Sequence, residues 1–156
     1  MFDATDLHTA CSYTRAEVEL TIRILLADDY ADWRRQVHLL LRTRPECHVI
    51  SEASDGLEAV QKAEELKPDL ILLDVGLPKL NGIEAARQIR QRSPNTKIIF
   101  LSQNCDLDVV RAALSTGAFG YIHKTDARRE LLPSVDAILR SEQFISSSNG
   151  FKSTAI

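Results

Sequence analysis

The feature that most constrains this chain is a short apolar run, residues 70–73, that ends at Asp74. Pro68 precedes the run, and Gly76 and Pro78 follow it. An apolar run bounded in this way is typical of a strand that is buried on both faces. We therefore expect Asp74 at the carboxyl edge of a sheet, in the crevice where open α/β sheets bind ligands. The simpler alternative is that Asp74 caps a loop, where aspartate is common.

Strand patterns and helix patterns alternate along the rest of the chain. The expected strands are residues 21–27, 47–53, 69–74, 96–101 and 118–123. A helical pattern follows each strand, and the last one contains Pro133, which should kink that helix or delay its start. Strand and helix in repeated alternation predict an α/β domain with a parallel sheet, right-handed crossovers and helices on both faces.

Length and composition indicate one ordinary globular domain. The chain has 156 residues, 44% of them hydrophobic and 26% charged. We expect a mobile N-terminal extension over residues 1–20, with a short helix as the alternative. The domain itself should span residues 21–141, and residues 142–156 have the composition of a linker or tail.

Charge and cysteine usage exclude several classes of function. The net charge of −3 offers no electrostatic footprint for direct nucleic-acid binding. No apolar run approaches the ~18 residues of a membrane span, and the N-terminus lacks the pattern of a secretion signal. Three cysteines without a Cys-x-x-Cys pair indicate reduced thiols and a cytoplasmic protein. The histidines have no zinc-ligand spacing.

Polar side chains end four of the five expected strands: Asp28-Asp29, Asp74, Ser102 and Lys124. In a parallel sheet these ends lie along one edge, so we expect the side chains to converge. Two carboxylates ~5 Å apart repel by about 3 kcal/mol at an effective dielectric near 20. Lys124 offsets part of that repulsion, and hard oxygen ligands without histidine or thiolate favour Mg²⁺ for the rest.

Carboxylates beside Mg²⁺, with a hydroxyl and a lysine opposite, indicate phosphoryl transfer. Asp74 is the best candidate nucleophile because it stands alone on the central strand. Asp28 and Asp29 would hold the metal, and the backbone carbonyl of Gly76 would complete its coordination, since glycine carries no side chain. Ser102 would donate a hydrogen bond to the phosphoryl group.

Each of these residues also has a purely structural explanation. Asp28-Asp29 suits the N-terminus of a helix, where the dipole favours acids. Ser102 suits an ordinary turn, and Lys124 suits a solvated surface. Tyr121 is best explained by core packing. The joint occurrence of these residues at successive strand ends favours the functional interpretation.

Together these residues resemble the receiver domain of bacterial two-component response regulators, over roughly residues 22–140. Residues 77–87 are most similar to the NarL/LuxR-type subfamily, and residues 144–146 resemble the start of its linker to a helix-turn-helix domain. The matching motifs are Ile24-Leu25-Leu26-Ala27-Asp28-Asp29, Leu72-Leu73-Asp74-Val75-Gly76-Leu77-Pro78 with Asn81-Gly82, Leu101-Ser102, and Gly120-Tyr121-Ile122-His123-Lys124.

The resemblance implies a flavodoxin-like, three-layer (βα)5 fold with a five-stranded parallel sheet in the order 2-1-3-4-5. It implies that Asp74 accepts a phosphoryl group from a sensor histidine kinase. It also implies that Asp28, Asp29, Asp74 and the carbonyl of Gly76 bind Mg²⁺.

The resemblance further implies how the switch works. Ser102 and Lys124 would engage the phosphoryl group, and Tyr121 would move inward with Ser102 on activation. The face formed by residues 106–140 would then change its affinity for partners, a second copy of the chain included. Thr125 stands where many receivers have a proline with a cis bond, so we expect a trans bond there.

Several functions compete at this stage. The favoured one is a signalling switch, the regulatory half of a transcriptional regulator, which catalyses only its own phosphorylation and dephosphorylation. A stand-alone receiver or adaptor is the alternative, since no DNA-binding domain follows in this sequence. An aspartate-nucleophile phosphatase ranks lower, because Gly76 occupies the position of its proton donor. A nucleotide-binding domain ranks last, because no glycine-rich phosphate motif is present.

Overall fold

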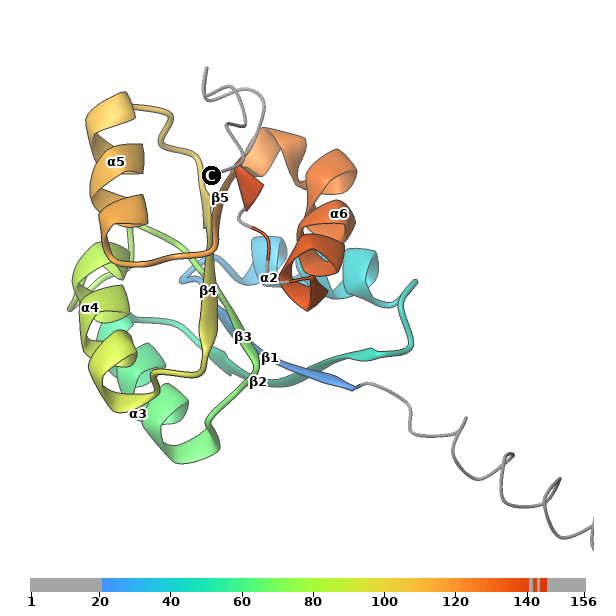
Figure 1. The fold of residues 1–156 in the computed structure, drawn as a ribbon, viewed down its shortest axis with the longest axis horizontal. Helices are drawn as coiled ribbons and strands as arrows, with labels where there is room; N and C mark the ends of the chain where they lie inside the picture. Colours follow the sequence, from blue (N-terminus) through green and yellow to red (C-terminus); the bar gives the residue numbers. More distant parts are fainter. Residues whose placement is uncertain (1–20, 141, 143, 146–156) are drawn as a thin grey trace, which may run out of the picture.

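The computed structural model of the chain describes residues 21–140, 142 and 144–145 (Figure 1). The expectations for residues 1–20 and for most of the C-terminal segment therefore lie outside the described residues. The strands are β1 (Ile22–Ala27), β2 (Cys47–Ala53), β3 (Leu70–Leu73), β4 (Lys97–Ser102), β5 (Gly120–His123) and β6 (Phe144–Ile145). The helices are α2 (Ala31–Leu41), α3 (Gly56–Leu66), α4 (Gly82–Arg92), α5 (Leu107–Ser115) and α6 (Ala127–Leu139), with a 3₁₀ turn, η1, at Lys124–Asp126.

All strand pairs are parallel, and the sheet has the order β2-β1-β3-β4-β5-β6. The expected order 2-1-3-4-5 is confirmed for the first five strands, as is the flavodoxin-like α/β fold. The structure adds a two-residue strand, β6, beside β5, in the segment for which we expected a linker or tail. The Phe144 amide donates to the carbonyl of Phe119 at 2.8 Å. A Cβ on Gly120 would lie 2.3 Å from the Phe144 carbonyl oxygen, so β6 can pair here only beside a glycine.

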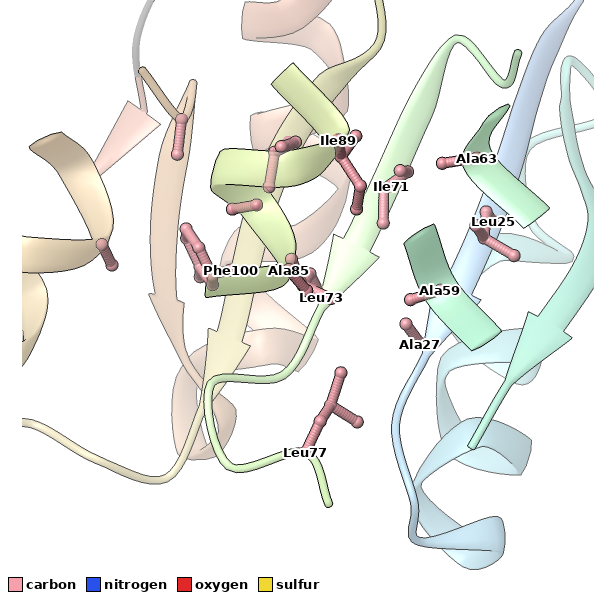
Figure 2. Close-up of a cluster of buried hydrophobic side chains, with 14 of the residues drawn as sticks. Leu25, Ala27, Ala59, Ala63, Ile71, Leu73, Leu77, Ala85, Ile89 and Phe100 are labelled. Carbon is pink, nitrogen blue, oxygen red and sulfur yellow. The ribbon is translucent and has the colours of Figure 1, made fainter. Parts of the chain in front are cut away.

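The sheet is covered on both faces, which explains why the β3 sequence is apolar throughout. Helices α3, α4 and α5 lie on one face, and α2 and α6 lie on the other (Figure 1). Ile71 and Leu73 belong to the first of the two hydrophobic clusters, which Figure 2 shows. Leu70 and Leu72 belong to the second cluster, on the opposite face. Because both faces are covered, the open positions for a ligand lie at the sheet's edges.

Local capping chemistry sets the starts of three helices. Asp55 caps α3 by accepting from the Glu58 amide at 2.8 Å. Asn81 caps α4 and Asp106 caps α5 in the same way. Helix α6 starts at Ala127, ahead of Pro133, so the alternative in which the proline delays its start is wrong. Of the helices described, none combines the length and the apolar character that crossing a membrane requires.

The register of the strands brings their carboxyl ends to one edge. Ala27, the last residue of β1, pairs with Ala53 of β2 and Leu73 of β3. Ser102, the last residue of β4, pairs with His123 of β5. Three of the candidate residues, Asp28, Asp74 and Lys124, directly follow the ends of β1, β3 and β5, and the fourth, Ser102, is itself the end of β4.

Candidate functional site

Three acidic side chains meet at the carboxyl edge of β1 and β3. One carboxylate oxygen from each of Asp28, Asp29 and Asp74 lies within 4.8 Å of the others. Asp28 is 1% exposed and Asp74 is 9% exposed, whereas Asp29 faces solvent. The backbone fixes the two buried acids, because the Asp74 amide donates to Ala27 O at 3.0 Å and the Asp28 amide donates to Ala53 O at 3.0 Å. The cluster therefore belongs to the sheet and not to a mobile loop.

Lys124 faces the acids from the end of β5. Its Nζ lies 2.6 Å from Asp28 Oδ2 and 3.8 Å from Asp74 Oδ2. The side chain is only 10% exposed, and Nζ lies 5.1 Å from the centroid of the Trp33 ring. A solvated surface lysine, one of the structural alternatives, is excluded by this burial. The lysine compensates one of the negative charges that the cluster concentrates.

The pKa of the Asp74 carboxyl lies above its ordinary range. Burial is the main cause; the charge on Lys124 lowers the pKa, and the charges on Asp28 and Asp29 raise it. A raised pKa is the direction that charge crowding predicts, but desolvation contributes more than the neighbouring acids do. A carboxylate in this position gains from any further cation that enters the cluster.

Gly76 contacts Asp74 through its backbone N–H, whereas the sequence drew attention to its carbonyl. Its backbone N–H donates to the Asp74 carboxylate, which lowers that carboxyl's pKa. A Cβ on Gly76 would meet only Asp74 Oδ2, at 3.9 Å, which is ordinary van der Waals contact. None of the described residues around position 76 therefore requires a glycine there on steric grounds. The role of its carbonyl in metal coordination stays a prediction.

Neutral hydrogen bonds form the other side of the site, at the ends of β4 and β5. The Tyr121 hydroxyl donates to the Asn104 carbonyl at 2.5 Å, and the Asn104 amide donates to Ser102 Oγ at 3.1 Å. Tyr121 is fully buried, and burial raises its pKa. The ring thus already occupies the inward position that the resemblance assigns to activation. The switching role of Ser102 and Tyr121 stays a prediction.

A pocket of about 290 Å³ opens between these two sides. It is lined by Asp74, Val75, Gly76, Ser102, Gln103, Asn104 and Lys124. The donor atoms of the acid cluster are all carboxylate oxygens, the ligands that a hard cation such as Mg²⁺ prefers. The residues present therefore fit a magnesium ion beside a pocket that can admit a phosphoryl group.

The turn after β5 has Thr125 at the position where the resemblance leads us to expect a proline, and hydrogen bonds hold this turn in place. The described peptide bonds are all trans, as expected for Lys124–Thr125. His123 has Nδ1 2.6 Å from Thr125 Oγ1 and Nε2 2.9 Å from Gln103 O. The histidine thus joins the loop after β4 to the turn that carries Lys124.

Gly82 is a residue whose role the sequence does not reveal. It is the first residue of α4, and a Cβ there would lie 1.9 Å from the Asp74 carbonyl oxygen. Its amide donates to Val75 O at 2.8 Å. Helix α4 thus begins against the backbone of Asp74 itself. The Asn81 cap before Gly82 is visible in the sequence, but this close approach is not.

The fold and the site together define a class of protein, the α/β proteins whose ligand site lies at the switch point of a parallel sheet. A doubly wound parallel sheet carries, at its topological switch point between β1 and β3, an acidic cluster that faces a buried lysine and a serine. Ligand sites of this architecture lie at that edge.

Comparison with known proteins gives the family. The family model of the response regulator receiver domain matches residues 24–136. The chain is 36% identical over 127 residues to the transcriptional regulatory protein DegU of Brevibacillus brevis, covering 81% of this chain and 54% of DegU. It is 39% identical over 121 residues to LiaR of Bacillus subtilis (strain 168), covering 78% of this chain and 57% of LiaR.

A solved structure supports the same family. A LuxR-family two-component response regulator from Aurantimonas sp. SI85-9A1 superposes with a TM-score of 0.79 at 33% identity, covering 83% of this chain and 93% of that one. The chain belongs to the response regulator receiver domain family. It spans little more than half the length of the curated relatives that it matches.

Proposed function

We propose that this chain is a phosphorylation-controlled switch in which Asp74 accepts a phosphoryl group from a sensor histidine kinase. The observation that carries the proposal is the position of the Asp74 carboxylate. It lies in a pocket, 3.8 Å from Lys124 Nζ and within 4.8 Å of two further acids. Family membership supports the reaction class, and the geometry supports the choice of acceptor.

The chemistry divides among residues of this chain. An Asp74 oxygen attacks phosphorus, forming an acyl-phosphate P–O bond while the P–N bond of the donor phosphohistidine breaks and its imidazole leaves. Asp28, Asp29, Asp74 and the carbonyl of Gly76 would hold Mg²⁺, which when bound neutralises phosphoryl oxygens. The direct contact of Lys124 with both buried acids keeps a cation at the pocket throughout.

The switch follows from what the phosphoryl group would do to its neighbours. Lys124 is shared between Asp28 and Asp74, so new negative charge on Asp74 draws its ammonium group toward the phosphoryl oxygens. Ser102 would donate its hydroxyl to the same group. Tyr121 and Asn104 are hydrogen-bonded on the far side of Ser102 and would transmit the change to the face at residues 106–140.

The same proposal sets the output and the partners. The chain would catalyse only its own phosphorylation and dephosphorylation, in the cytoplasm, as the regulatory half of a transcriptional regulator; the printed names of DegU and LiaR support that output. Homodimers would form through the 106–140 face, where Leu107 and Leu139 are exposed. We also propose residues 21–141 as the receiver unit, with the segment from 142 as its connection onward.

The test is labelling by a small-molecule phosphodonor. With acetyl phosphate and Mg²⁺, the wild-type chain should gain one phosphoryl group and Asp74→Asn should gain none. Asp69→Asn, at the opposite end of the same strand, should label like the wild type. Labelling of Asp74→Asn at the wild-type level would place the acceptor elsewhere.

A further inference from the structure

Asp28 makes hydrogen bonds through its amide, its carboxylate and its backbone carbonyl. Its amide donates to Ala53 O at 3.0 Å. Its carboxylate accepts from the Tyr30 amide at 2.9 Å and from Lys124 Nζ at 2.6 Å. Its backbone carbonyl accepts from Nη1 of Arg34 at 2.6 Å. The contact from Arg34 is the one that the phosphoacceptor site does not explain.

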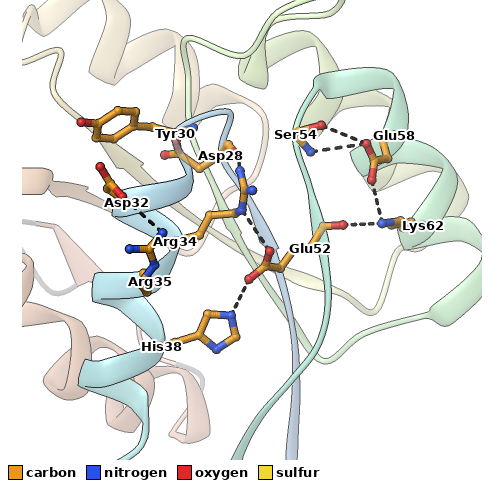
Figure 3. A network of polar contacts seen from close by, with 10 residues as sticks. All are labelled: Asp28, Tyr30, Asp32, Arg34, Arg35, His38, Glu52, Ser54, Glu58 and Lys62. Atoms are coloured by element: carbon orange, nitrogen blue, oxygen red, sulfur yellow. Dashed lines mark hydrogen bonds and ion pairs between the residues drawn. The ribbon is translucent and has the colours of Figure 1, made fainter.

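Arg34 joins Asp28 to the end of the neighbouring strand. The side chain projects from α2, and its Nε lies 3.0 Å from Glu52 Oε2 while its Nη1 reaches the Asp28 carbonyl. Figure 3 shows the guanidinium between Asp28 and Glu52. The side chain is only 19% exposed, and the fork of an arginine suits a contact to two oxygens at once. Arg34 therefore acts as a bridge and not as a solvated surface charge.

Glu52 is itself fixed, so the bridge has a rigid support. His38 Nε2 lies 2.5 Å from Glu52 Oε1, and Lys62 donates to the Glu52 carbonyl (Figure 3). Burial acts to raise the pKa of the Glu52 carboxyl, but the hydrogen bonds from His38 and Arg34 outweigh it, and the pKa lies below its ordinary value. The carboxylate thus stays ionised and available to Arg34.

The last two residues of β2 hold the Asp28 backbone at two points, its amide and its carbonyl. Ala53 binds its amide directly, and Glu52, one residue earlier, binds its carbonyl through Arg34. The two peptide groups that flank the Asp28 Cα are therefore each held by a hydrogen bond. Because the carboxylate is attached to that backbone, its direction toward the metal position depends in part on Arg34 and Glu52, which do not line the pocket.

We propose that Arg34, anchored by Glu52, is a positioning residue that aims the Asp28 carboxylate at the metal and so sets the affinity of the site for Mg²⁺. This inference rests on the Mg²⁺-dependent function proposed above. Partners that orient metal ligands typically account for a 10–100-fold difference in metal affinity. Arg34 faces the Asp28 carbonyl and not the phosphoacceptor pocket, so its effect should fall on Mg²⁺ binding and not on the transfer step at saturating Mg²⁺.

Arg34→Ala tests this against the adjacent Arg35→Ala. Arg35 is 74% exposed and pairs with Asp32 on the same helix at 3.4 Å, so it is a matched control for charge and helix position. Calorimetric titration with MgCl₂ should give a Kd about 10–100-fold weaker for Arg34→Ala and unchanged for Arg35→Ala. The rate of acetyl phosphate labelling at saturating Mg²⁺ should be the same in both.

A metal-free readout separates the inference from the proposed function. In EDTA, hydrogen exchange of the Tyr30 amide, which donates to Asp28, should be faster in Arg34→Ala than in Arg35→Ala. Glu52→Gln, which removes the anchoring charge but keeps the shape, should move Mg²⁺ affinity and Tyr30 exchange in the same direction. It serves in place of Arg34→Ala if that variant fails to fold.

The outcomes are distinct. Failure of the wild-type chain to bind Mg²⁺ would overturn the proposed function, whatever the variants do. If the wild type binds Mg²⁺ and both Arg34→Ala and Glu52→Gln bind it equally well, the positioning role is overturned. A slower labelling step at saturating Mg²⁺ with unchanged Mg²⁺ affinity would overturn it as well.

Discussion

The site has two halves that are built by different physical means. The acidic half consists of Asp28, Asp29, Asp74 and Lys124, in which charge is concentrated and partly buried. The hydroxyl half consists of Ser102, Asn104 and Tyr121, which are joined by neutral hydrogen bonds. The three acids follow β1 and β3, and Lys124 reaches them from the end of β5. In the hydroxyl half, Ser102 ends β4, Asn104 lies in the loop after it, and Tyr121 belongs to β5.

This difference assigns different work to each half. Charge interactions in a partly dry site are strong and respond to each ion that enters or leaves. Neutral hydrogen bonds contribute only about 0.5–1.5 kcal/mol each, so they can rearrange at low cost. The acidic half is therefore suited to bind the metal and the phosphoryl group, and the hydroxyl half to report their presence to the rest of the domain.

Lys124→Met should break the acidic half with the largest effect. The substitution leaves the buried Asp28 carboxylate without its partner, and breaking a buried ion pair costs about 3–5 kcal/mol. Chemical denaturation in EDTA should show that loss, and labelling by acetyl phosphate should slow by about 10²–10³-fold, as for loss of an electrostatic stabiliser. Lys79→Met, which removes an exposed lysine, should change stability by less than about 0.5 kcal/mol. Equal effects of the two substitutions would show that Lys124 is only a surface charge.

The acidic half should also make metal-free stability depend on pH. The pKa of Asp74 is raised in the folded chain, mainly by burial, so the folded state binds more protons than the unfolded state above the ordinary aspartate pKa of about 3.9. Its contribution to stability is therefore present at low pH and is lost as the pH rises through the folded-state pKa. Asp74→Asn should stabilise the chain at pH 7 in EDTA, with an advantage that shrinks toward pH 4. Urea midpoints that differ by the same amount at every pH would contradict the raised pKa.

Tyr121→Phe alters the hydroxyl half and should have the smallest effect of these substitutions. It removes the hydrogen bond to Asn104 but keeps the buried ring, at a cost of about 0.5–1.5 kcal/mol. The rate of labelling and the affinity for Mg²⁺ should not change, because the Tyr121 hydroxyl belongs neither to the acidic cluster nor to the lining of the pocket. Tyr30→Phe, on an exposed ring, is the control. A labelling defect as large as that of Lys124→Met would move Tyr121 into the chemistry.

The sequence predicts the acidic half better than its surroundings. Asp74 and Lys124 are visible because charged residues at the ends of apolar strands conflict with burial, and strand alternation alone places them on one edge. Gly82 is not predictable in this way, since its contact with the Asp74 backbone depends on how α4 approaches β3. Gly76 differs from Gly82, because a Cβ there would make only an ordinary contact with Asp74 Oδ2 at 3.9 Å, and its proposed part in metal coordination stays a prediction.

The remaining differences have a similar origin. Strand β6 pairs with β5 through two residues of a polar segment, and a two-residue strand leaves no hydrophobic period in the sequence. The bridge from Glu52 through Arg34 to Asp28 joins residues on a strand, a helix and a loop. Single charged residues of this kind are common on surfaces, so only the tertiary structure reveals that these form one network.

The central claim is that Asp74 is the residue that carries the phosphoryl group, and its direct test is to locate that group. The chain is labelled with acetyl phosphate and Mg²⁺, reduced with borohydride, which converts an aspartyl phosphate to homoserine, and mapped by peptide mass spectrometry. The account predicts homoserine at position 74 and nowhere else. Homoserine at position 28 or 29 with unmodified Asp74 would contradict it.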